Sequence, residues 1–190
     1  MKNPIDSSNA RHQVRSCHIA ADPLENWLPL PNSNYDHRGI KIASSNTEIL
    51  AVGSIWPNHS KTESLTGAQW SVEKDYPFYV DISESAVVSK DQDFYVFGGW
   101  SDYNAIATIA KFNAATREWS QVGTMKSPRV GHSVISIGNS FMIVGGIGQT
   151  HIEECVGEET VDCQNTDLTL KNYEYYPALF TVNMNFCVAR

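Results

Sequence analysis

The stretch that decides the fold is SAVVSKDQDFYVFG, residues 85–98. Two other segments, IKIASSNTEILAVG at 40–53 and HSVISIGNSFMIVG at 132–145, align with it over fourteen positions without a gap. Each has a short apolar run, a polar turn, and a second run rich in β-branched and aromatic residues. This pattern is typical of a β-hairpin. We expect three hairpins, with second strands that end at Gly53, Gly98 and Gly145.

The hairpins recur with a fixed period. Their final glycines lie 45 and 47 residues apart, and tryptophans at 27, 70 and 119 follow a similar spacing. A period near 46 residues with almost no helical periodicity indicates four short strands per unit, which is the blade of a β-propeller. We therefore expect an all-β propeller of about four blades, which is either part of a larger ring or an incomplete ring. The expected parts are a flexible segment 1–15 and units of about 16–38, 39–84, 85–131 and 132–190.

The block 85–133 resembles a kelch repeat. An apolar strand precedes Gly98-Gly99, Phe112 lies seven residues before Trp119, and Arg129 and His132 open the next unit. The following copy keeps a double glycine in FMIVGG, which ends at 146. The resemblance covers roughly residues 16–180 and implies a kelch-type β-propeller. It departs from the family pattern at Gly53-Ser54, at Ala20 where an aromatic is expected, and in the last unit, which lacks a tryptophan.

The motif residues are expected to build the scaffold. Double glycines let the chain turn where a Cβ would strike neighbouring backbone, and large aromatics fill the wedge between blades. The arginine and histidine are expected to hydrogen-bond one blade to the next. This structural set comprises Gly53, Gly98, Gly99, Gly145, Gly146, Phe112, Trp27, Trp70, Trp119, Arg129 and His132.

Charge and hydropathy exclude two classes of partner. The 190 residues include 14 Lys and Arg against 21 Asp and Glu, which gives a formal net charge of -7. Such a charge repels phosphate backbones, so nucleic-acid binding is not expected. No stretch reaches the ~18 consecutive apolar residues that a membrane-spanning helix needs, and the start of the chain lacks the apolar run of a signal peptide.

Two of the four cysteines, Cys155 and Cys163, are expected to form a disulfide. They lie eight positions apart around Gly157, so a third and a fourth strand at 152–156 and 160–164 would place them on one face. This tail resembles the end of kelch regions in secreted invertebrate proteins. A disulfide would place the parent protein outside the cell, whereas two buried thiols would suit a cytoplasmic one. The pairing of Cys17 and Cys187 stays open.

Other features suggest weaker sites. Asn58-His59-Ser60 is a formal N-glycosylation acceptor. The acidic cluster of Glu153, Glu154, Glu158, Glu159 and Asp162 would bind calcium or a basic partner, but a solvated hairpin is the more ordinary explanation. His151 lacks the regular ligand spacing of a metal site, so neither a metal nor a cofactor is expected.

No motif of a nucleophile, a phosphate-binding loop or a metalloprotease is present, so we expect a protein that is not an enzyme. Repeat scaffolds carry variable loops on a rigid frame, and the loops after the double glycines are the expected contact surface for a protein partner. The candidate partner-binding residues are Trp100, Asp102, Tyr103, Gln149 and His151.

Three function classes are consistent with these features. The first is a scaffold for protein–protein interaction through loops on the blade face. The second is an extracellular adhesion, matrix or glycan-binding module, which the disulfide would favour. The third is the substrate-receptor part of a ubiquitin ligase, which would require a BTB or F-box domain. Because an incomplete ring leaves apolar blade faces open, self-association through those faces is also expected.

Overall fold

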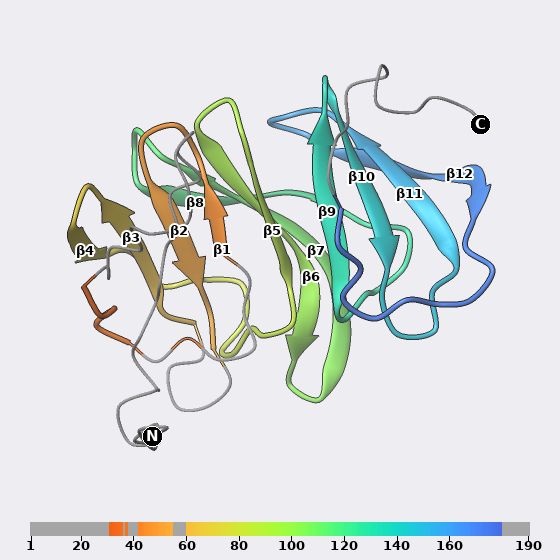
Figure 1. Cartoon of the computed structure of the whole chain (residues 1–190), viewed down its shortest axis with the longest axis horizontal. Helices are drawn as coiled ribbons and strands as arrows, with labels where there is room; N and C mark the ends of the chain where they lie inside the picture. The colour runs from red at the N-terminus through yellow and green to blue at the C-terminus, as the bar shows by residue number, and fades with distance from the viewer. Residues whose placement is uncertain (1–30, 36, 38–41, 55–59, 180–190) are drawn as a thin grey trace, which may run out of the picture.

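The computed structural model describes residues 31–35, 37, 42–54 and 60–179, and this part of the chain is all-β (Figure 1). Twelve strands form three antiparallel four-stranded sheets, which we call blades 1, 2 and 3. Blade 1 comprises β1 (Ile42–Ser44), β2 (Ile49–Val52), β3 (Thr62–Thr66) and β4 (Gln69–Val72). Blade 2 comprises β5 (Ala86–Lys90), β6 (Asp93–Ser101), β7 (Asn104–Asn113) and β8 (Glu118–Thr124). Blade 3 comprises β9 (His132–Ile137), β10 (Ser140–Gly145), β11 (His151–Val156) and β12 (Asp162–Thr169).

The predicted all-β fold of four-stranded blades is confirmed. Strands pair in chain order within each blade, and the first strand of blade 2, β5, contacts the first strands of the other two blades, β1 and β9. Most of the first predicted unit lies outside the described residues, as do Trp27, Cys17, Cys187 and the asparagine of the glycosylation motif. The predicted limits of the units stay predictions.

One predicted strand end is wrong. β2 ends at Val52 and β10 at Gly145, close to the expected positions, but β6 continues through Gly98 and Gly99 to Ser101. Its pairing with β7 shifts register between Phe97 and Gly99, which marks a β-bulge. The double glycine therefore bends β6 without ending it, because β7 extends far enough to pair with the additional residues.

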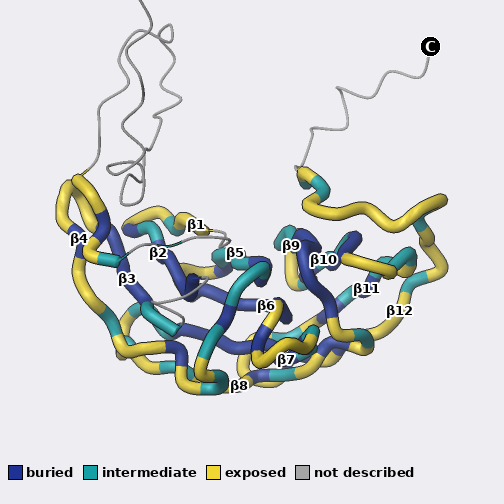
Figure 2. Tube along the Cα trace, turned by 90° about the horizontal axis from the view of Figure 1, so that it is seen from below, coloured by how far each residue is buried: buried dark blue, intermediate teal, exposed yellow. Residues whose placement is uncertain are grey.

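The core lies between the blades (Figure 2). Blade 2 packs against blade 3 through Tyr95 and Phe97, whose rings lie 4.8 and 5.2 Å from the ring of Phe141. On its other face, Phe94 and Val96 pack with Leu50 of blade 1. Alternation along β6 thus sends side chains into both interfaces, as the period of two in a strand requires.

Close approach of other backbone segments explains two of the repeat glycines. Gly53 has φ +78°, and a Cβ there would lie 2.2 Å from the carbonyl oxygen of Ile82. Gly98 has φ +51°, and its Cβ would lie 2.9 Å from the carbonyl oxygen of Ile106. A side chain at either position would be strained and would also displace backbone.

A buried ion pair fixes the segment that precedes blade 3. Arg129 is fully buried and donates to Glu153 Oε1 at 3.0 Å and to the carbonyl of Gly145 at 2.7 Å. An equivalent contact exists in blade 1, where His37 bonds Glu63 at 2.9 Å and the carbonyl of Gly53 at 2.7 Å. In both blades a residue sixteen positions before the glycine binds that glycine and a buried glutamate.

The repeat tryptophans anchor the linking segments. Trp70 donates its indole N–H to the carbonyl of Pro31 at 2.9 Å, and Trp119 donates to the carbonyl of Lys74 at 3.0 Å. Trp119 also packs against Phe112, with ring centroids 5.1 Å apart. Trp70 is buried, whereas Trp119 is only half-buried. His132 is buried where β9 begins, and the predicted blade-to-blade hydrogen bond from it stays a prediction.

The predicted disulfide between Cys155 and Cys163 is confirmed. The two residues are directly paired between β11 and β12, and their Cα atoms lie 4.0 Å apart. The neighbouring acidic cluster is not simply a solvated hairpin. Glu153 is buried against Arg129, and two residues of the β11–β12 turn pair with lysines of blade 2. These two pairs are Glu158 with Lys90 and Glu159 with Lys111.

Candidate partner-binding surface

The turn between β6 and β7 presents an exposed tyrosine. Ser101 pairs with Asn104, which leaves Asp102 and Tyr103 as the two turn residues. Their φ angles are +45° and +60°, as a type I′ hairpin requires at both central positions. Glycine, asparagine and aspartate adopt this conformation most readily, so a tyrosine is unusual. Its side chain is 88% exposed, so packing does not explain its presence.

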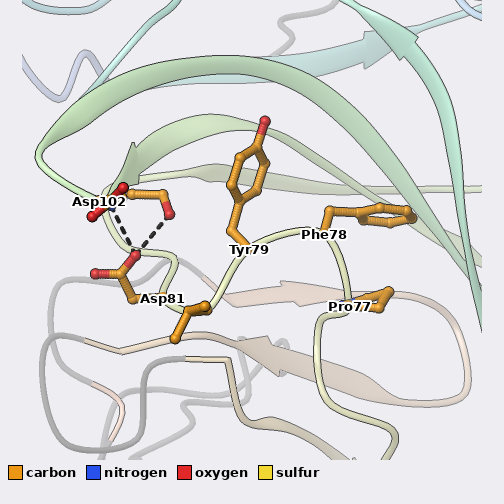
Figure 3. A pocket seen from close by; sticks show the side chains of 7 residues that line it. Pro77, Phe78, Tyr79, Asp81 and Asp102 are labelled. Atoms are coloured by element: carbon orange, nitrogen blue, oxygen red, sulfur yellow. Dashed lines mark hydrogen bonds between the residues drawn. The ribbon is translucent and has the colours of Figure 1, made fainter.

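A pocket of about 620 Å³ lies beside this turn (Figure 3). Its wall comes from the linking segment 77–81 and from the end of β6. The residues that line it are Pro77, Phe78, Tyr79, Val80, Asp81, Ser101 and Asp102. Val80 is 88% exposed, so the linking segment adds an apolar side chain to the surface. We call this pocket together with Trp100 and Tyr103 the hairpin surface.

Asp81 attaches the turn to the linking segment. Its Oδ1 accepts hydrogen bonds from the Ser101 hydroxyl at 2.7 Å and from the backbone N–H of Asp102 at 3.0 Å (Figure 3). Next to it, Ser83 and Trp100 exchange backbone hydrogen bonds of 2.7 and 3.1 Å. The Asp81 carboxylate and the Ser83–Trp100 backbone hydrogen bonds therefore join the β6–β7 turn to the linking segment. These contacts fix the backbone that carries the exposed side chains.

Aromatic residues support the wall of the pocket. The Tyr79 hydroxyl hydrogen-bonds Thr108 Oγ1 at 2.7 Å, and its ring stacks on Tyr76 at 6.5 Å. Tyr76 is buried, and its ring also meets the ring of Trp119 edge-on at 5.1 Å. Burial raises the pKa of Tyr76 far above its usual value, so this side chain stays neutral.

The five predicted partner-binding residues do not form one cluster. Trp100, Asp102 and Tyr103 lie together at the β6–β7 turn, with Trp100 40% exposed. Gln149 lies in the β10–β11 connection of blade 3, and His151 is the first residue of β11; this connection is at the same end of the sheets as the β6–β7 turn (Figure 1). The backbone carbonyl of His151 accepts a hydrogen bond from Arg129, which gives this residue a contact within the scaffold.

Sequence reasoning missed the segment 77–81. The repeat pattern marks it only as a proline-containing connection, although PFYVD holds two aromatic residues and an aspartate directly before a repeat. The β-bridge between Ser83 and Trp100 joins the linking segment that precedes β5 to the end of β6. An alignment of the repeats does not reveal a contact of this kind. The composition of the segment is the signal that could have found it.

Glu153, Cys155 and Cys163 are the only acidic, histidine or cysteine side chains grouped closely enough to suggest a metal among the described residues. The two cysteines form the disulfide and the glutamate is paired with Arg129, so these groups are already engaged. Within the same described ranges, no helix is long and apolar enough to cross a membrane.

Four-stranded antiparallel blades with a double glycine and a packed pair of aromatic rings are the features of a β-propeller made of sequence repeats. Residues 82–126 match the family model described as Kelch motif, and the predicted resemblance to kelch-repeat proteins is confirmed. The fold is similar to a solved structure described as YjhT, with a TM-score of 0.60 and 14% identity over 73% of this chain and 49% of that one.

Three curated relatives illustrate the similarity. The chain is 25% identical to Kelch-like protein 25 of Xenopus tropicalis over 84% of its length and 28% of the relative. It is 24% identical to Kelch repeat and BTB domain-containing protein 1 of Horsepox virus over 71% of its length and 26% of the relative. It is 33% identical to Tip elongation aberrant protein 1 of Schizosaccharomyces pombe over 43% of its length and 7% of the relative. The chain thus spans about a quarter of the first two relatives.

Proposed function

We propose that this protein is a non-catalytic kelch scaffold that binds a protein partner through the hairpin surface. The observation that carries the proposal is Tyr103, a tyrosine held in a left-handed turn conformation with 88% of its side chain exposed. Residues kept in an unfavourable conformation without a packing reason are frequent at functional sites. Tyrosine and tryptophan are also the residues that most often anchor protein interfaces.

The charge of the surface favours a basic partner. Asp81 and Asp102 stand beside Tyr79 in the pocket, and the chain carries a net charge of -7. Carboxylates next to exposed aromatic rings attract lysine and arginine side chains by charge and by cation–π contact. The proposed ligand is therefore a basic segment of another protein, with at least one side chain long enough to enter the pocket.

Selection of peptides from a displayed random library on the wild-type protein tests this proposal. The selected peptides are expected to be rich in lysine or arginine, and Tyr103→Gly is expected to weaken their binding about tenfold. Glycine suits the turn, so this variant keeps the fold. Tyr173→Ala removes another exposed tyrosine outside the hairpin surface and serves as the control. Peptides that bind Tyr103→Gly as well as the wild type would refute the proposed surface.

Two observations favour different settings for this binding. The disulfide of Cys155 with Cys163 favours the extracellular adhesion, matrix or glycan-binding alternative, because such bonds persist in oxidising compartments. The name of the horsepox relative includes a BTB domain, which favours the ubiquitin-ligase alternative. Peptide mapping without reduction, on protein from its natural source, distinguishes them. A linked pair supports the extracellular setting, and two free thiols support the intracellular one.

A further inference from the structure

The loop that the disulfide closes, residues 156–162, reaches from blade 3 to blade 2, and we call it the clasp loop. Two of its carboxylates pair with lysines, and one of its backbone N–H groups donates to a carbonyl. The three pairs are Glu158 with Lys90 at 3.1 Å, Glu159 with Lys111, and Val161 with Val122 at 2.7 Å. The partners in blade 2 lie on β5, β7 and β8, so one short loop contacts three of the four strands of the neighbouring blade.

The two lysines are buried, and the clasp loop supplies charged partners for them. The side chains of Lys90 and Lys111 are 5% and 6% exposed. Asp93 also pairs with Lys111 at 3.0 Å, whereas the ion pair of Lys90 in the described part of the chain is with Glu158. Burial alone would lower the pKa of Lys111, but hydrogen bonds to Glu159 and Asp93 raise this pKa above its usual 10.5, so the side chain stays charged. Opening of the loop would leave Lys90 buried without a carboxylate, which is unfavourable.

Gly123 of β8 allows the backbone of the clasp loop to approach blade 2. It forms a parallel bridge with Val161, and a Cβ on Gly123 would lie 2.3 Å from the carbonyl oxygen of Val161. Gly123 is not one of the glycines with a positive φ, so its own backbone conformation also suits alanine. Close approach of the loop is therefore the reason for a glycine at this position.

The disulfide fixes both ends of the clasp loop. Cys155 and Cys163 are directly paired between β11 and β12, and both are buried in the core between blades 2 and 3. The cross-link reduces the number of open conformations available to the loop. A thiol reagent reaches buried sulfur atoms only when the surrounding structure opens. The disulfide and the contacts to blade 2 therefore stabilise each other.

We propose that the clasp loop is a redox-sensitive clasp, which holds blade 3 on blade 2 while Cys155 and Cys163 are joined and opens when they are reduced. The reductant is a dithiol. One of its thiolates attacks a sulfur of the bond, its second thiol completes a disulfide within the reagent, and two electrons and two protons pass to the cysteines. In the reduced protein the loop leaves both lysines. The clasp shares no residue with the hairpin surface and does not depend on the proposed function.

The rate at which dithiothreitol reduces the folded protein tests the coupling. A Cys17→Ser, Cys187→Ser background makes the release of free thiols report on the disulfide alone. Gly123→Ala is expected to be reduced about tenfold faster than this background, because a displaced Val161 carbonyl lets the clasp loop open more often. The reciprocal nature of coupling requires this effect if the disulfide holds the loop on blade 2.

A second variant and a control separate this effect from a general loss of stability. Glu158→Gln combined with Glu159→Gln weakens the clasp without a change in the backbone and is also expected to speed reduction. Glu48→Gln breaks an ion pair between blades 1 and 2, with Arg117, and is expected to be reduced at the background rate. Equal rates for the clasp variants and the background, or resistance of the folded protein to the dithiol, would overturn the proposal.

Hydrogen exchange before and after reduction provides an independent readout on the wild-type protein. Amides of 157–163 are expected to exchange at least about tenfold faster in the reduced protein, whereas those of β3 in blade 1 should keep their rates. Unchanged exchange in the clasp loop would overturn the proposal. A uniform acceleration in all three blades would also overturn it, because the disulfide would then contribute only to global stability.

Discussion

At the scale of single residues, two buried glutamates hold linking segments against the blades by hydrogen bonds. Glu63 and Glu153 lie on the third strands of blades 1 and 3, and each binds the linking segment that precedes its blade. Backbone N–H groups of that segment bind the same carboxylates, at Asn34 for Glu63 and at Lys126 for Glu153. Each buried carboxylate therefore accepts hydrogen bonds from backbone N–H groups of an irregular segment, which has no strand partner to accept them.

Glu63→Gln is expected to remove part of the acid sensitivity of the protein. Burial tends to raise the pKa of Glu63, but hydrogen bonds from His37, Asn34 and Tyr35 outweigh it, so the pKa lies below its usual 4.5. The contribution of Glu63 is therefore complete above pH 4.5 and is lost as the pH falls through the lower pKa of the folded state. The measurement is urea unfolding of both proteins at several pH values.

The variant is expected to be less stable than the wild type by about 3 kcal/mol near neutral pH, because His37 and the segment lose a charged partner. The difference between the two proteins should shrink toward low pH. A difference that stays constant from pH 7 to the acid limit of folding would show that the charge of Glu63 does not contribute.

Tyr76 and Tyr79 allow a matched comparison of two hydroxyl groups. The Tyr76 hydroxyl is buried without a hydrogen-bond partner among the described residues, whereas the Tyr79 hydroxyl bonds Thr108. Tyr76→Phe is expected to leave stability unchanged or to raise it by up to about 1 kcal/mol, and Tyr79→Phe to lower it by about 1 kcal/mol. Thermal unfolding of both variants checks this order. A larger loss for Tyr76→Phe would reveal a partner for its hydroxyl.

At the scale of elements, the β6–β7 hairpin combines two long, regularly paired strands with a turn whose two central residues have positive φ angles. Its strands are the longest in the described chain, with 9 and 10 residues, and the bulge at Phe97 and Gly99 keeps them paired beyond the double glycine. Blade 2 therefore extends its turn and places Tyr103 beside the linking segment. The same extension brings Trp100 into contact with Ser83.

Tyr103→Gly is expected to stabilise the protein by about 0.5 to 1 kcal/mol. Aspartate followed by glycine is a preferred pair for a type I′ turn, and removal of the side chain relieves the φ of +60° without loss of buried contacts. Chemical unfolding measures the change. Asp102→Gly is the companion variant and should gain less, since aspartate already tolerates this conformation. A loss of stability in Tyr103→Gly would mean that the tyrosine contributes to folding.

At the scale of the whole molecule, the two outer blades have faces without a neighbouring blade among the described residues. Blade 3 exposes Ile137 by 50%, and blade 1 exposes Ile42 by 46%. Ile42 pairs with Ala51, on the face away from blade 2. Both faces are apolar surfaces of the kind that blades elsewhere in this protein bury against each other.

The protein is expected to self-associate, and Ile42→Asp is expected to weaken this association. A charge on the open face of blade 1 would need to be desolvated at the contact. Val80→Asp places the same charge on an apolar residue that is 88% exposed in the linking segment and serves as the control. Sedimentation over a range of concentrations checks both. A compact monomer of 21.1 kDa for the wild type would contradict the expectation.

The sequence alone determined the strand pattern, the blade period and the disulfide. These features depend on contacts that are local or that recur at a fixed spacing, such as the hairpin of residues 132–145 and the eight positions between Cys155 and Cys163. The exposed turn residues Asp102 and Tyr103 were also predicted as part of a contact surface, because they follow a recognisable double glycine.

Only the tertiary structure decided the rest. The bulge that carries β6 past Gly98 depends on how far β7 continues to pair with it. The ion pair of Arg129 with Glu153 and the pocket formed with Asp81 depend on contacts between strands and linking segments. Glu153 shows the physical reason: its sequence neighbours suggest a solvated acidic hairpin, yet alternation along β11 turns it into the interface where Arg129 compensates its charge. Burial of a charge is set by the neighbouring blade, and the local pattern does not contain that information.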